Sequence, residues 1–496
     1  MNIKQAKDEI IHTVQAYLSK DETGAYKIPV IRQRPILLMG PPGIGKTQIM
    51  EQIAKECGIG LVSYTITHHT RQSAVGLPFI REKEFQGKTY QVTEYTMSEI
   101  IASVYQKMEE TGLLEGILFI DEINCVSETL APTMLQFLQK KTFGNQAVPD
   151  GWLIAAAGNP PEYNKSVREF DMVTLDRVRW ILAEADYGVW KEYARNRNLH
   201  GALLSYLNLR PKNFYRVEAD VSGLQYVTAR GWEDFSYLLY AYEERGLSVS
   251  EEIVYEYLHH RDVAEDAAAY IDMYRKYQDD YGIDKILCGN VKPSVFARIY
   301  AAEFDERLSV VNLLLDGLMK FFHRAFFEKE VTDAYFDFLK SYRKGAEESE
   351  DFCQEYERRV RELEQSVREK EQAGFLNKEE KRRSERLILL LKKGKPSGRA
   401  GSLQEAFEEA RRFFLLQQEN LETSETAAES ALEYAFDFME EAFAAGEEMV
   451  VFVTELTVGK EAAAFLAEHM CRRYLKYNQE LLIGSRRREL LSELNQ

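Results

Sequence analysis

The chain has 496 residues, of which 45% are hydrophobic, and a formal net charge of −17. This length predicts about two to four domains, each able to bury a core of its own. The net negative charge argues against broad binding to nucleic acid or anionic membranes, but it does not exclude a local basic groove.

Cysteine usage and hydropathy indicate a reduced, cytoplasmic protein. The five cysteines are odd in number and show no C-x-x-C spacing, so we expect neither disulfides nor a zinc site. The first ten residues lack the apolar region of a signal peptide. No apolar run approaches the roughly 18 residues that a membrane span needs.

An amphipathic helix is predicted over residues 3–18, and an unbroken apolar run beginning at Pro35 follows it. Such a run is typical of a strand buried on both faces of a parallel sheet. It stops at Gly40–Thr47, GPPGIGKT, which fits the phosphate-loop pattern G-x-x-x-x-G-K-[ST]. Ile49 and Ile53 then continue at helical spacing.

This pattern predicts binding of a nucleoside triphosphate. Glycines let consecutive N–H groups point at phosphate oxygens, and the following helix adds the positive end of its dipole. Lys46 can reach the outer phosphates of ATP, and the Thr47 hydroxyl can ligate Mg²⁺. A glycine-rich turn with a chance lysine is the alternative. The predicted cofactor-binding residues are Pro42, Gly43, Ile44, Gly45, Lys46, Thr47 and Gln48.

Alternating strands and helices continue to about residue 186. Strands are expected at 61–66, 116–121, 152–157 and 180–183, helices at 97–108 and 127–140, and a β-hairpin at 79–95 around Gln86-Gly87. This order predicts a parallel, three-layer α/β domain over residues 1–186. The adjacent His68 and His69 lack a matching ligand set and are interpreted as solvated loop histidines.

From Tyr187 onward the chain reads as helical, and we expect domains at 187–330 and 331–496. Tyr356, Val360, Leu363 and Val367 recur at steps of four and three, a coiled-coil-like seam. A basic turn at 392–399 and a capping box from Ser402 precede a helix with Leu403 and Phe414 on its apolar face, and a further helix is expected at 432–443. These stripes are interpreted as helix–helix core.

Carboxylates end one of the predicted strands. Asp121 can hold Mg²⁺ through water, and Glu122 is placed to polarise a water against the γ-phosphate. The pair favours hydrolysis over transfer to a second substrate. The alternative is that both carboxylates cap the next helix.

Three further candidates follow along the chain. Asn159 can orient the attacking water, its alternative being a turn residue before Pro160. Arg177 or Arg179 can contact the γ-phosphate bound by a neighbouring subunit, and such an arginine finger raises the rate by roughly 10³–10⁵. The alternative for each is a surface salt bridge, and we favour Arg177 for the finger role. Arg230, at a helix start, can contact the γ-phosphate from the helical part, or can be an ordinary surface arginine.

Residues 1–245 resemble the AAA+ ATPases and, within them, the MoxR family. The resemblance rests on Walker A at Gly40–Thr47, Walker B at Ile117–Glu122, a sensor-1 segment at Ala155–Pro160, Leu175-Asp-Arg177 as an arginine-finger segment, and Thr228-Ala-Arg230 as a sensor-2 helix start. The 79–95 hairpin sits where that group carries an insertion. Where the family often has Phe after Asp-Arg, this chain has Val178 and Arg179, so the finger stays open between two arginines.

The resemblance implies an ATP-hydrolysing, Mg²⁺-dependent homo-oligomeric ring, commonly a hexamer, with ATP at subunit boundaries. It implies a chaperone-like remodelling role on protein clients, beside a partner with a von Willebrand factor type A domain. An AAA+ motor or loader directed at nucleic acid is the alternative, for which Lys381–Arg383 and Arg486–Arg488 would be the basic clusters. Two other functions are disfavoured. A GTP-dependent switch would need a guanine-binding motif that this sequence lacks, and a non-catalytic scaffold would not need Glu122 and Asn159.

Overall fold

The computed structural model describes residues 1–68, 74, 76–143, 146–163, 167, 170–220, 223–347, 351–397 and 402–481. The chain divides into two compact units. The first comprises Met1–Val189, Thr228–Arg230 and Gln372–Phe375, and the second comprises Trp190–Val227, Gly231–Glu371 and Leu376–Gln496. In the described part of the chain, no helix combines the length and hydropathy that crossing a bilayer requires.

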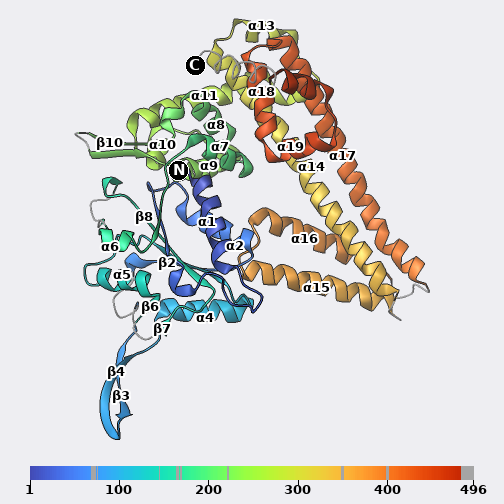
Figure 1. Ribbon diagram of the computed structural model, residues 1–496. Helices are drawn as coiled ribbons and strands as arrows, with labels where there is room; N and C mark the ends of the chain where they lie inside the picture. The colour runs from blue at the N-terminus through green and yellow to red at the C-terminus, as the bar shows by residue number, and fades with distance from the viewer. Residues whose placement is uncertain are drawn as a thin grey trace, which may run out of the picture. The chain divides into compact units, whose positions relative to one another are not determined.

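A five-stranded parallel sheet forms the centre of the first unit, as the sequence predicted (Figure 1). In spatial order its strands are β2 (Gly60–Thr65), β5 (Gly116–Asp121), β8 (Trp152–Gly158), β1 (Ile36–Met39) and β9 (Arg179–Leu182). β8 therefore lies between β1 and β5 and pairs with both. Because all strands run parallel, the residues that follow β1, β5 and β8 meet at one edge of the sheet.

Helices cover both faces of this sheet and give the predicted three layers. One face packs against α4 (Glu99–Thr111) and α5 (Ala131–Lys140) in a single hydrophobic cluster. α1 (Ile3–Leu18) contacts α2 (Lys46–Cys57), which in turn packs on β2 and β5. A short α6 (Met172–Leu175) precedes β9.

The start of α5 corrects one prediction. The expected helix from Ser127 begins only at Ala131, since the preceding residues form a turn in which the Ser127 carbonyl accepts from the N–H groups of Leu130 and Ala131. Pro132 then occupies the first helical turn, where its missing N–H costs nothing.

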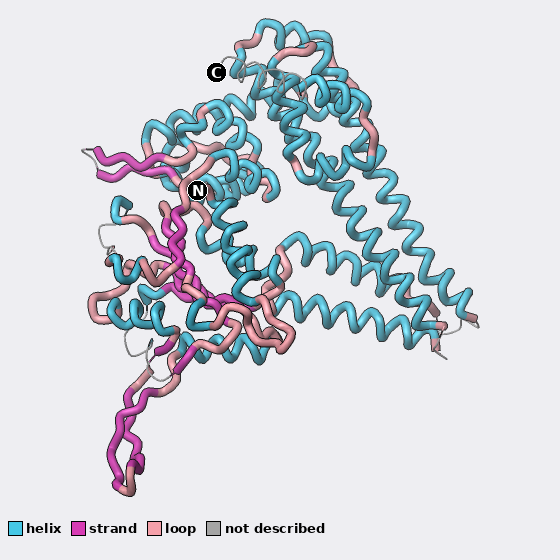
Figure 2. The backbone as a smooth tube through the Cα atoms, viewed as in Figure 1, coloured by secondary structure: helices cyan, strands magenta, loops and turns pink. Residues whose placement is uncertain are grey.

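The predicted hairpin is confirmed as β3 (Pro78–Phe85) and β4 (Lys88–Tyr95). Its turn has positive φ at Gln86 (53°) and Gly87 (75°), as a two-residue hairpin turn of type I′ requires. Figure 2 shows the hairpin projecting from the rest of the first unit, and β3 is exposed along its whole length. A second, very short hairpin joins β6 (Thr142–Phe143) to β7 (Gln146–Ala147).

The second unit is mostly helical. Its helices include α8 (Gly201–Leu209), α10 (Glu251–Leu258), α11 (Arg261–Tyr281), α12 (Ile283–Leu287), α13 (Pro293–Ala301), α14 (Phe304–Ala346), α16 (Lys378–Lys393), α17 (Leu403–Phe443), α18 (Glu447–Val458) and α19 (Lys460–Glu468). Residues 472–481 are also helical. α7 (Tyr187–Asn196), α9 (Ala229–Glu244) and α15 (Phe352–Gln372) each have residues in both units.

Two predictions for this unit are wrong in detail. β10 (Arg216–Asp220) and β11 (Gly223–Val227) form an antiparallel hairpin where only helix was expected. Leu224 is 57% exposed, so the hairpin buries little apolar surface. The alternation of apolar and polar residues that predicts a strand is therefore weak in this segment. The two helices expected at 402–414 and 432–443 are one helix, α17, because no Gly or Pro interrupts the residues between them.

The predicted seam is partly buried in a core cluster. Tyr356 and Val360 of α15 are buried there with Tyr342 of α14 and Leu391 of α16. The boundary expected after residue 330 falls inside α14, which runs unbroken for 43 residues. The division into three domains stays a prediction.

Candidate nucleotide-binding site

The loop Gly40–Thr47 joins the buried strand β1 to helix α2. Gly43 (φ 75°) and Gly45 (φ 95°) adopt left-handed conformations that a Cβ would penalise. Among the described residues, no protein acceptor receives the backbone N–H groups of residues 43–48. Backbone N–H groups without a protein acceptor at the start of a helix can donate hydrogen bonds to phosphate oxygens.

The predicted binding residues differ in what they can offer. The side chain of Ile44 is buried, so only its backbone is available to a phosphate. Pro42 is half-buried and has no N–H to donate. Gln48 is exposed at the start of α2.

Lys46 is buried within this loop. Its Nζ donates to the carbonyl oxygens of Gly40 and Pro41 and to Oδ1 of Asn159, each at 2.8 Å. Burial lowers the pKa of Lys46 to about 8, with Asp121 opposing the shift and Arg230 adding to it. The amine thus connects the loop after β1 to the residue after β8.

Thr47 and Asp121 face each other across the same edge of the sheet. The Thr47 hydroxyl donates to Oδ2 of Asp121 at 2.6 Å, and Oδ1 of Asp121 accepts from the Glu122 N–H at 2.9 Å. A hydroxyl beside a carboxylate is an oxygen pair of the kind that Mg²⁺ prefers. These two residues fit the metal that the loop implies.

Glu122 occupies a left-handed conformation, with φ 56°. For a non-glycine residue this costs about 1–3 kcal/mol. The turn allows the next N–H, of Ile123, to bond the Ala157 carbonyl of β8 at 2.9 Å. The Glu122 carboxylate accepts from the Thr67 hydroxyl, just past β2, at 3.1 Å. Thr67 was not predicted, because a lone threonine after a strand carries no signal.

Asn159 is held by a second asparagine that the sequence analysis missed. The buried Asn124 donates from Nδ2 to the Asn159 carbonyl at 2.8 Å. Its Oδ1 finds no donor among the described residues and faces Gly158, where a Cβ would lie 2.5 Å away. Only its position two residues after Glu122 could have marked Asn124. It is a positioning residue for Asn159.

Arg230 lies close enough for its charge to act on Lys46, although its side chain is exposed. The start of α9 approaches the loop, since a Cβ on Gly43 would lie 2.9 Å from Cβ of Thr228. The structure thus brings together Lys46, Thr47, Asp121, Glu122, Asn159 and Arg230.

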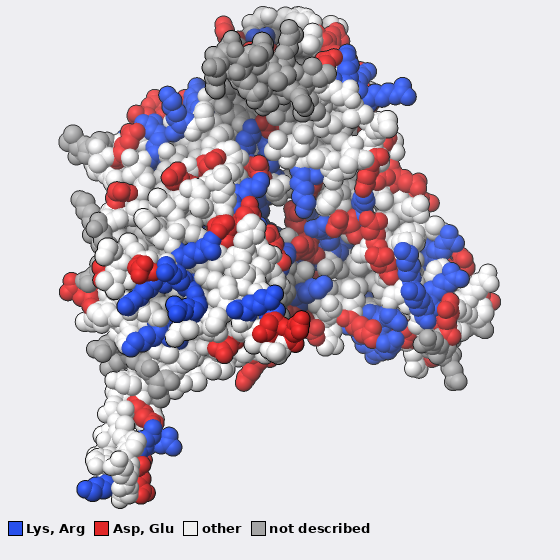
Figure 3. Space-filling model, in the orientation of Figure 1, with Lys and Arg blue, Asp and Glu red and all other residues white. Residues whose placement is uncertain are grey.

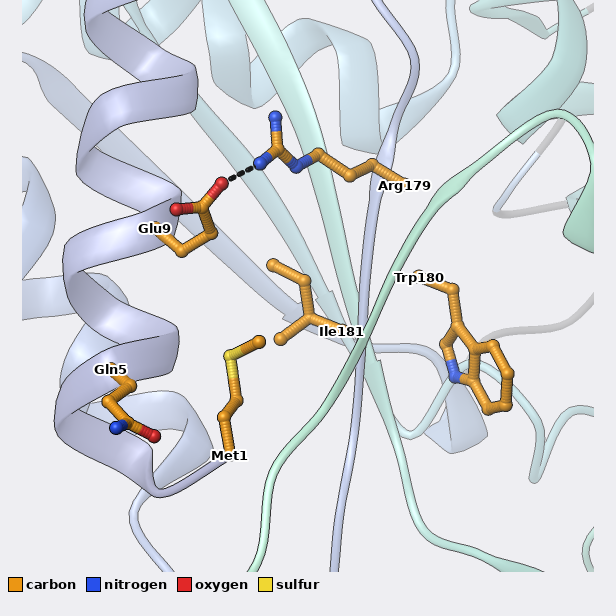
Figure 4. Close-up of a pocket in the computed structure, with 6 residues that line it drawn as sticks. All are labelled: Met1, Gln5, Glu9, Arg179, Trp180 and Ile181. Atoms are coloured by element: carbon orange, nitrogen blue, oxygen red, sulfur yellow. Dashed lines mark hydrogen bonds and ion pairs between the residues drawn. The ribbon is translucent and has the colours of Figure 1, made fainter.

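Arg177 and Arg179 lie apart from this group. The exposed Arg177 donates to Gln139 of α5. Arg179 pairs with Glu9 of α1, beside a pocket that Met1, Trp180 and Ile181 also line (Figure 4). The side chains of His68 and His69 lie outside the described residues.

Residues 36–175 match the model of the ATPase family associated with various cellular activities (AAA). The match begins at β1 and ends with α6, so it includes Lys46, Thr47, Asp121, Glu122 and Asn159. A search of curated proteins found no match to the chain. The chain therefore carries an AAA ATPase domain, followed by a mostly helical region.

The buried amine predicts a pH dependence of ATP binding. Below about pH 8 Lys46 is protonated with or without a triphosphate. Above that pH, binding must take up a proton, so affinity should fall by up to about tenfold per pH unit. Calorimetry between roughly pH 7 and 9.5 measures the Kd. Lys46→Arg, which keeps its charge, should show no such fall. A wild-type Kd that stays flat would contradict the shifted pKa.

The second prediction concerns Asn124. Asn124→Ala leaves the Asn159 carbonyl unpaired, so ATP turnover should fall about tenfold, equivalent to about 1.4 kcal/mol, while ATP affinity stays within about twofold. Steady-state kinetics and a separate Kd measurement distinguish the two effects. Ser127→Ala, at an exposed position on the same turn, is the matched control. Equal loss of affinity and turnover would indicate a merely structural role.

Proposed function

We propose that this chain hydrolyses ATP with Mg²⁺ at the edge of its parallel sheet. The observation that carries the proposal is the pair of contacts from adjacent loop residues, Lys46 to Asn159 and Thr47 to Asp121, at 2.8 and 2.6 Å. Together they join a phosphate-binding loop to the residues needed to break the phosphate bond. A bound Mg²⁺ would supply charge neutralisation between the outer phosphates.

Each residue has a distinct task in this proposal. The N–H groups from Gly43 to Gln48 and the ammonium of Lys46 bind the phosphates, and Thr47 and Asp121 hold Mg²⁺. Glu122 accepts a proton from the attacking water. Asn159 orients that water, and Arg230 stabilises the γ-phosphate.

We propose that the chain assembles into a homo-oligomeric ring, a hexamer, and the exposure of Arg177 supports this proposal. Arg177 is exposed and bonded only to a surface glutamine among the contacts described, so it is available to a neighbour's γ-phosphate. Arg179 is committed to Glu9 of its own chain. We therefore assign the finger to Arg177.

The finer assignment is a MoxR-type, chaperone-like remodelling ATPase in the cytoplasm. It is supported by the projecting hairpin β3–β4, which is inserted between β2 and α4, in addition to the motifs. We propose protein clients and a partner with a von Willebrand factor type A domain.

Of the two basic clusters that would favour a nucleic-acid motor, the one at Lys381–Arg383 has acidic partners. Lys381 pairs with Glu371 at 2.5 Å, and Arg383 pairs with Glu330 at 2.9 Å. Basic and acidic side chains are interspersed over these helices (Figure 3). Arg486–Arg488 lies outside the described residues.

Two variants of the same site test the proposal. Glu122→Gln should bind ATP within about twofold of wild type and hydrolyse it about 10²–10⁴-fold more slowly, since only the proton acceptor is lost. Lys46→Ala should instead weaken ATP binding by at least about tenfold. Calorimetry gives affinity and phosphate release gives turnover. Wild-type turnover by Glu122→Gln would remove Glu122 from this role.

A further inference from the structure

Three helices of the second unit bring a histidine and two glutamates to one point. His323 comes from α14, Glu379 from α16 and Glu461 from α19. One ligand atom of each lies within 4.8 Å of the other two, and His323 Nδ1 lies 2.9 Å from Oε1 of Glu461. The three residues come from positions far apart in the sequence, so no motif predicted them.

We propose that His323, Glu379 and Glu461 form a binding site for a divalent transition metal of the Zn²⁺ class. Imidazole nitrogen and carboxylate oxygen are both zinc ligands, with bonds of about 2.0–2.2 Å. Ligand atoms around such an ion lie roughly 3–3.5 Å apart, so a shift of about 1 Å closes the present arrangement. Glu379 is exposed and can make that shift by a change of rotamer.

A simpler reading is that each glutamate only stabilises a helix start. Glu379 and Glu461 do lie in the first turns of α16 and α19, where acidic side chains are favourable. That reading does not explain why a half-buried histidine from a third helix meets both. A proton competes with the metal for the ring nitrogen of His323, because the hydrogen bond to Glu461 raises the pKa of this histidine.

The same unit contains an arrangement that cannot hold a metal in this way. His469, just past α19, contacts Glu429 through Nδ1 at 2.7 Å and Glu425 through Nε2 at 3.5 Å. The two ring nitrogens point in opposite directions, so one ion cannot engage both carboxylates and the ring. His469 therefore offers a matched control with the same residue types.

A metal at this site would tie the starts of α16 and α19 to the middle of α14. Binding that requires the folded arrangement stabilises it in proportion to the metal present. The site would thus act as a cross-link within the helical unit. It is separate from the nucleotide site and independent of the function proposed for it.

Titration of the full-length chain with Zn²⁺, and with Co²⁺ as an absorbing probe, tests the site. Wild type should bind with a ligand-field band for Co²⁺ and a raised Tm. His323→Ala and Glu379→Gln should each weaken this binding by at least about tenfold and abolish the Tm shift, and His469→Ala should change neither. Glu379→Gln alters an exposed side chain and keeps the test valid if His323→Ala misfolds.

Three outcomes would overturn the proposal. Wild type could bind neither metal, leaving a proton as the occupant of His323. Both site variants could bind as tightly as wild type, which would place the metal elsewhere on the chain. His469→Ala could lose binding as severely as His323→Ala, which would remove the distinction between the two clusters.

Discussion

The buried amine of Lys46 is the contact on which the candidate site depends. A charged group loses its hydration when buried, and three acceptors at 2.8 Å replace that hydration here. Two of the acceptors fix the curvature of the loop, and the third, Asn159, fixes the loop against the end of β8. The lowered pKa of Lys46 shows that this compensation is incomplete. Phosphate oxygens would complete it.

Strand order makes this contact available. Because β8 lies between β1 and β5, Asn159 lies between the loop with Lys46 and the carboxylates after β5. Glu122 lies in a strained turn that two backbone hydrogen bonds hold, from the Ile123 N–H to the Ala157 carbonyl and from the Cys125 N–H to the Glu122 carbonyl. Asn124 fixes Asn159 from the same turn. The candidate catalytic residues thus lie at the ends of buried strands, which hold them more rigidly than free loops would.

The predictable parts of the molecule are those with local signals. The loop, the helix at Ile3–Leu18 and the hairpin at Gln86-Gly87 follow from glycine placement and periodicity alone. The left-handed Glu122 could not be predicted, since a glutamate does not favour that conformation and tertiary bonds impose it. The Glu9–Arg179 pair spans 170 residues and leaves no pattern in the sequence. The same holds for His323, Glu379 and Glu461.

We propose that one protomer binds the triphosphate around Lys46 and that its neighbour supplies Arg177. Mixing the variants Arg177→Ala and Glu122→Gln distinguishes a shared site from one contained in a single protomer, because each variant alone should be nearly inactive. In mixed assemblies some boundaries combine an intact Glu122 with an intact Arg177, and random mixing at equal amounts should restore about a quarter of wild-type turnover. Mixed assemblies that form without any gain in turnover would show that Arg177 does not act on a neighbour's site.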